Sequence, residues 1–178
     1  MNTPEELLKY MSDDITYGYV DLNGKTYTDM NDFHDKCIVQ TDEELFKTKY
    51  GTCWDQTEAE RYWFNKNNYK TKTIFIWFEG VKENYLPTHT FLLYESNGKW
   101  YHFENAFEDY RGIHEFNTID EAINAAIEKH LEYAIKNYGI SRDYKKYITY
   151  FEYEKPPKNL DVDSYLEYVT NNSYQRIK

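Results

Sequence analysis

Three residues whose side chains suit thiol chemistry follow one another along the chain: Cys53, His89 and Glu104. Cys53 lies in residues 51–55 (GTCWD), where a glycine ends one helical pattern and a second one begins. His89 opens an alternating, strand-like segment, and Glu104 closes the next one. A cysteine at a helix N-terminus, followed by a histidine and a carboxylate on a β-hairpin, provides the groups that a thiol nucleophile needs for acyl transfer.

Two features of the expected structure would activate the thiol. An ordinary thiol is mostly protonated at pH 7 and is then a weak nucleophile. The first turn of a helix presents unpaired backbone N–H groups and the positive end of the helix dipole, which favour a thiolate. A nearby histidine can hold the thiol proton, and the backbone N–H of Cys53 is a natural donor to an oxyanion. Asp55 would oppose the thiolate if its carboxylate faced the sulfur.

The alternation of side chains along the hairpin indicates which residue lies next to His89. Residues 97–98 (NG) predict a two-residue turn between the two strands. That turn places His89 and Glu104 on one face as diagonal neighbours, and it places Asn105 on the other face. A three-residue turn would reverse the parity and favour Asn105 as the orienting group. We therefore expect Glu104 to orient the imidazole, with Asn105 as the alternative.

The apolar pattern predicts the elements that position these groups. A helix is expected over residues 52–64, and residues 73–78 are apolar on both alternating faces, as in a central strand. Residues 89–95 and 99–105 form the hairpin. The longest helix is expected over residues 118–138, opened by a capping box and closed by a glycine.

The ends of the chain complete an α+β fold in which a helix bearing the cysteine packs on an antiparallel sheet. Helices are expected from Thr3 and Thr41, and a hairpin over residues 15–27. A further strand over residues 147–153 precedes a terminal helix over residues 163–170.

The length favours one domain covering residues 1–178. Within it, residues 1–50 hold N-terminal helices and a hairpin, and residues 51–107 hold the catalytic core. Residues 108–178 hold the long helix, a strand and the terminal helix. This division follows the elements predicted from the sequence.

Composition excludes several classes of protein. Lys and Arg total 21 against 31 Asp and Glu, a formal charge of −10, which argues against nucleic acid or an anionic membrane as the partner. Two cysteines do not make a disulfide framework. The sequence has no secretory signal pattern and no apolar run of membrane-spanning length, so the expected location is the cytoplasm.

Three blocks of the sequence resemble the conserved blocks of the transglutaminase-like superfamily, within the wider papain-like group. They are residues 51–55 (GTCWD), 88–91 (THTF) and 100–104 (WYHFE). Residues 111–116 (RGIHEF) are similar to the segment after the acid in a little-studied bacterial branch of that superfamily. The resemblance covers about a third of the chain.

The resemblance implies a papain-like or transglutaminase-like core. It further implies that Cys53 is the nucleophile, His89 the general base and acid, and Glu104 the orienting acid. The acid of transglutaminases is usually an aspartate in an Asp-Pro-Thr-like block, whereas this chain has glutamate followed by Asn105 and Ala106. This difference leaves the geometry between the histidine and its acid to be established.

Four further residues are expected to contact substrate: Tyr50, Trp54, Asn105 and His114. Tyr50 is also a candidate side-chain donor to an oxyanion, as is Gln40. Trp54 would wall a groove, although packing in the core explains an aromatic there equally well. His114 follows a glycine in an expected loop, from which it would line the cleft or serve a structural role.

The expected activity is cysteine-dependent acyl transfer on a protein or peptide substrate, with hydrolysis favoured over transfer to an amine. No metal or organic cofactor is expected, since His34 and Cys37 have metal-ligand spacing without a second pair. Three alternatives remain: an amide transferase, a deamidase that acts as a toxin or effector, and an inactive binding module in which Cys53 is a packed thiol.

Overall fold

The main sheet of the computed structural model is antiparallel, and it supports the candidate site. The structure describes residues 1–82, 85–171 and 173–177, and within these ranges the strand order is β10-β9-β5-β6-β7-β8. β5 pairs with β6 and with β9, so the expected central strand is confirmed. The strands are β5 (Thr71–Phe78), β6 (His89–Ser96), β7 (Lys99–Glu104), β8 (Gly112–Phe116), β9 (Ile148–Tyr153) and β10 (Ser173–Ile177).

The hairpin between β6 and β7 has the two-residue turn that the sequence predicts. Asn97 and Gly98 have φ values of 51° and 74°, the left-handed conformation that such a turn requires. Ser96 pairs with Lys99, so alternation places Glu104 on the face that carries His89. The predicted register is therefore confirmed.

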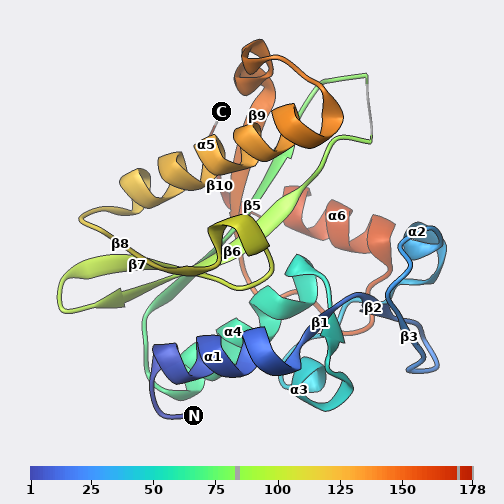
Figure 1. Cartoon of the computed structure of the whole chain (residues 1–178), viewed down its shortest axis with the longest axis vertical. Coiled ribbons are helices and arrows are strands. Elements are labelled where there is room, and N and C mark those ends of the chain that lie inside the picture. The colour runs from blue at the N-terminus through green and yellow to red at the C-terminus, as the bar shows by residue number, and fades with distance from the viewer. Residues whose placement is uncertain (83–84, 172, 178) are drawn as a thin grey trace.

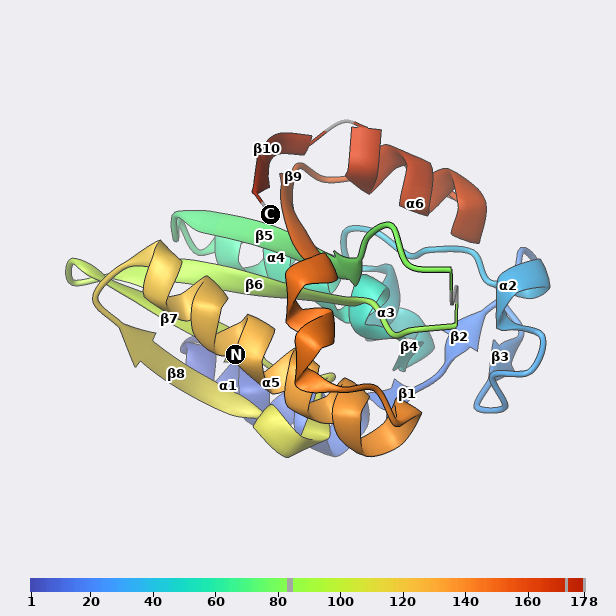
Figure 2. The ribbon, with the colours of Figure 1, turned by 90° about the horizontal axis from the view of Figure 1, so that it is seen from above.

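Helices cover both faces of the sheet (Figures 1 and 2). On one face, α5 (Ile119–Tyr138) packs against side chains such as Ile76 of β5. On the other face lie α1 (Pro4–Asp14), α4 (Cys53–Lys66) and α6 (Val162–Asn171). The structure is thus α+β, with the sheet between two helical layers. No helix in the described ranges combines the length and the apolar character that a membrane crossing requires.

Short elements connect the N-terminal part to the start of α4. β2 (Tyr19–Val20) and β3 (Thr26–Tyr27) form the expected hairpin in a shorter form, and α2 (Phe33–Lys36) and α3 (Glu44–Thr48) follow it. β1 (Thr16–Tyr17) pairs in parallel with β4 (Tyr50–Gly51), which local sequence patterns did not predict. The pairing brings Tyr17 opposite Gly51, two residues before Cys53.

α4 is buried along most of its length, although many of its residues are polar. All residues from Cys53 to Arg61 are buried. Arg61 donates from Nε to Glu58 Oε2 at 2.9 Å and from Nη2 to Thr73 Oγ1 at 2.6 Å. The two charged side chains are 8% and 0% exposed, so each needs the other as a partner.

The substitution Arg61→Met is expected to lower the free energy of unfolding by about 3–5 kcal/mol, because Glu58 would remain buried without its partner. Urea unfolding followed by circular dichroism measures this change. The matched control is Lys9→Met, which removes one partner of the exposed Lys9–Asp13 pair and should cause no measurable change. Equal effects at the two pairs would contradict the prediction.

Candidate active site

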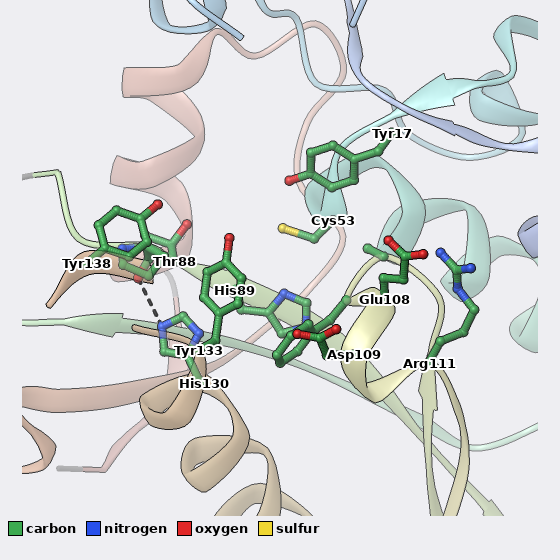
Figure 3. Close-up of a pocket in the computed structure, with 13 residues that line it drawn as sticks. Tyr17, Cys53, Thr88, His89, Glu108, Asp109, Arg111, His130, Tyr133 and Tyr138 are labelled. Carbon is green, nitrogen blue, oxygen red and sulfur yellow. Dashed lines mark hydrogen bonds between the residues drawn. The ribbon is translucent and has the colours of Figure 1, made fainter. Parts of the chain in front are cut away.

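Cys53 is the first residue of α4, as the sequence predicts. Thr52 is the N-cap, in an extended conformation with φ of −77° and ψ of −178°. The Cys53 side chain is 7% exposed and reaches the wall of a cavity (Figure 3). Its position in the first turn places the sulfur at the positive end of the helix dipole.

His89, the first residue of β6, lies between Cys53 and Glu104. Its Nε2 donates to Glu104 Oε2 at 2.7 Å, which leaves Nδ1 for the sulfur. Burial alone would lower the pKa of His89, but the Glu104 carboxylate and a hydrogen bond with Cys53 outweigh burial and raise it. The imidazole is therefore held in its charged form.

Glu104 is fixed by three hydrogen bonds. Besides the bond from His89, its Oε2 accepts from His102 Nε2 at 3.0 Å, and its Oε1 accepts from the Phe107 N–H at 2.9 Å. Burial would raise the pKa of Glu104, but the charge of His89 and the donors around the carboxylate lower it. Burial lowers the pKa of His102, so His102 serves as a neutral donor. Glu104 is thus an ionised carboxylate, and hydrogen bonds to both of its oxygens fix its position.

Asp55 bonds to Thr52 and Gln40 rather than to the Cys53 sulfur. Its Oδ2 accepts from the Thr52 N–H at 2.7 Å and from Thr52 Oγ1 at 3.0 Å, and its Oδ1 accepts from the Gln40 N–H at 2.8 Å. Burial raises the pKa of Asp55 to about 6. These bonds close the capping box and join the preceding segment to the helix.

A cavity of about 600 Å³ opens at Cys53 and His89 (Figure 3). Its walls come from β1, the segment before β6, the turn after β7, and α5. The lining residues are Tyr17, Cys53, Pro87, Thr88, His89, Ala106, Phe107, Glu108, Asp109, Arg111, His130, Tyr133 and Tyr138.

Several of these residues were not predicted from the sequence. Tyr17 reaches the cavity through the pairing of β1 with β4, and Tyr133 reaches it from α5. His130 is buried, with its Nε2 at 3.0 Å from the Pro87 carbonyl, and burial lowers its pKa to about 3. A helical pattern predicts α5 but not which part of it faces a cavity, so no local signal would have found these residues.

The structure corrects the predicted substrate contacts of Trp54 and Asn105, neither of which lines the cavity. Trp54 is buried and stacks on Tyr165, with ring centroids 4.3 Å apart. Asn105 lies on the opposite face from His89, where its Nδ2 donates to Gln56 Oε1 at 2.7 Å. Both side chains instead join α4 to its neighbours, Trp54 to α6 and Asn105 to the end of β7.

Tyr50 and His114 also lie outside the cavity lining. The Tyr50 carbonyl accepts from Gln40 Nε2 at 2.6 Å, a bond that engages the Gln40 amide away from the sulfur. His114 lies in β8 rather than in the expected loop, and its ring stacks on Tyr110 at 4.0 Å. His114 thus holds the turn that comes after Glu104.

Comparisons with known proteins give no relative from which function can be inferred. No family model matches the chain, and neither a curated protein nor a solved structure matches it. Among the described residues, no three His, Cys, Asp or Glu side chains gather as a metal-ligand set. The interpretation of the site therefore depends on its own geometry and chemistry.

The substitution Glu104→Gln is expected to lower the pKa of His89 by about 1–3 units, because an opposite charge within contact shifts a pKa by that amount. Titration of the His89 ring signals by NMR measures the shift. Glu95→Gln is the matched control, since Glu95 lies on the same hairpin but pairs with Lys70. An unchanged His89 titration in Glu104→Gln would show that the carboxylate does not set the charge of the imidazole.

Proposed function

We propose that the protein is a cysteine-dependent acyl-transfer enzyme that hydrolyses a peptide or carboxamide through Cys53, His89 and Glu104. One observation carries this proposal: a single imidazole, bonded to a buried carboxylate, lines the same cavity wall as the thiol. A cavity of about 600 Å³ has the size of sites that bind small molecules or a few residues of a peptide.

In the acylation step, Cys53 Sγ attacks the carbonyl carbon and a C–S bond forms. The carbonyl electrons move to oxygen, which gives a tetrahedral intermediate. His89, protonated while the thiolate is present, donates its proton to the leaving nitrogen. The C–N bond breaks, and an amine or ammonia leaves a thioester on Cys53.

In the second step, neutral His89 removes a proton from water, which attacks the thioester carbon. The C–S bond breaks, the carboxylic acid departs, and the thiolate and imidazolium are restored. Glu104 keeps Nε2 as a donor in both steps, so Nδ1 always faces the reacting atoms. An amine that took the place of water would make the same site an amide transferase.

We further infer that this arrangement is a transglutaminase-like one. Three features support the inference: the cysteine begins a helix, the histidine begins an antiparallel strand, and the acid ends the next strand. The substitution of glutamate for the usual aspartate is compatible with this geometry, since Glu104 Oε2 is 2.7 Å from the imidazole.

Alkylation of the folded protein by iodoacetamide tests the thiol. At pH 7, Cys53 is expected to react faster than an ordinary thiol, of which only about 3% is ionised. His89→Ala should remove most of that advantage, because the imidazolium would no longer stabilise the thiolate. Cys37 is the internal control: it is buried, burial raises the pKa of its thiol, and it should react only after unfolding.

Acylation by p-nitrophenyl acetate tests the next step. An acetyl group is expected on the peptide that contains Cys53, found by mass spectrometry, and it should be absent in Cys53→Ala. A Cys53 that alkylates at an ordinary rate, and equally in His89→Ala, would favour a binding module with a packed thiol. Fast alkylation without acylation would show that the thiol is reactive but does not carry out acyl transfer.

A further inference from the structure

The hydroxyl group of Tyr17 lies beside the reacting sulfur. Figure 3 shows the phenol pointing from β1 across the cavity wall toward Cys53. Tyr17 exposes 49% of its surface, and it lines the same cavity as Cys53. A large aromatic side chain has thus been placed with its polar end next to the nucleophile.

The fold sets this position through the parallel pairing of β1 with β4. Tyr17 pairs with Gly51, and the Thr16 N–H donates to the Lys49 carbonyl at 2.8 Å. β4 leads directly into α4, so the same short segment that delivers Cys53 also holds the strand of Tyr17. The phenol and the first N–H of the helix therefore meet at one point.

A tetrahedral intermediate needs donors at the oxygen, and two other polar side chains, Gln40 and His130, are engaged elsewhere. Gln40, one donor considered from the sequence, bonds through Nε2 to the Tyr50 carbonyl and accepts from Thr48 through Oε1. His130, in the cavity wall, bonds to the Pro87 carbonyl. The Tyr17 hydroxyl points toward the Cys53 sulfur in the cavity wall (Figure 3).

We propose that Tyr17 is a catalytic residue whose hydroxyl, together with the backbone N–H of Cys53, binds the oxyanion of the tetrahedral intermediate. This proposal rests on the proposed function. The substrate carbonyl oxygen enters between the two groups. As sulfur attacks and the carbonyl electrons move to oxygen, both donors bond to the developing charge. When the C–N bond breaks, the carbonyl re-forms and the phenol keeps its proton.

The electrostatics of the phenol suit a donor that does not ionise. Burial of the hydroxyl raises the pKa of Tyr17, and the negative charge of the Cys53 thiolate raises it further. The O–H group therefore stays protonated throughout the neutral range. A neutral donor next to a developing negative charge stabilises it without disturbing the ion pair of Cys53 and His89.

The test compares two reactions of the same sulfur in Tyr17→Phe. Alkylation by iodoacetamide is a direct displacement that forms no oxyanion, whereas acylation by p-nitrophenyl acetate passes through one. Tyr17→Phe is expected to slow acylation of Cys53 by about 10²-fold, the usual effect of losing one such donor. The alkylation rate and its pH profile should stay within about 2-fold of wild type, a ratio worth only a few tenths of a pK unit.

The matched control is Tyr27→Phe, which removes a phenol hydroxyl from the same N-terminal segment, where it bonds to Asp21 rather than to the site. Both rates should match wild type in this variant. If Tyr17→Phe slows acylation and alkylation equally, Tyr17 stabilises the thiolate or the fold rather than the oxyanion. That result would overturn the proposal. Unchanged acylation would overturn it as well. If Cys53 of the wild-type protein is alkylated but never acylated, the proposed function itself is wrong, and the role of Tyr17 fails with it.

Discussion

The buried carboxylate of Glu104 is the interaction on which the arrangement of the site depends. Its two oxygens accept from His89, from His102 and from the Phe107 backbone, so the acid is held on both sides. The hairpin turn supplies the register that brings acid and imidazole together, and the longer reach of glutamate closes a diagonal distance. The negative charge of Glu104 also raises the pKa of His89 against the opposing effect of burial.

A second constraint is the buried polar surface of α4. A central helix with charged and amide side chains is costly unless each group finds a partner, and here the partners are distributed among neighbouring elements. Asp55 bonds to Thr52 and Gln40, and Gln56 bonds to Asn105, which follows directly on Glu104. The helix start is thereby joined both to the segment before it and to the end of β7. These bonds fix the position of Cys53 relative to Glu104.

Local sequence patterns made the longer elements and the His89–Glu104 pair predictable, whereas the arrangement set by contacts between distant segments could not be predicted. The left-handed turn at Asn97 fixes a register, so the pairing of His89 with Glu104 could be predicted from the sequence alone. Trp54 was misplaced because adjacent helical residues point about 100° apart, and the residue after Cys53 turns into the core. The β1–β4 pairing and the cavity wall depend on long-range packing, and no local pattern in the sequence encodes it. Tyr17 was missed for that reason.

The parallel pair of β1 and β4 has a consequence for how the protein could be switched off. Each strand has two residues, so little free energy opposes local opening of the pair compared with unfolding of the main sheet. Fraying there would withdraw the Tyr17 hydroxyl while the hairpin of His89 and Glu104 stayed intact. In the proposed mechanism, a protease or a partner that captured this N-terminal ribbon would slow turnover and leave a folded protein with a reactive sulfur.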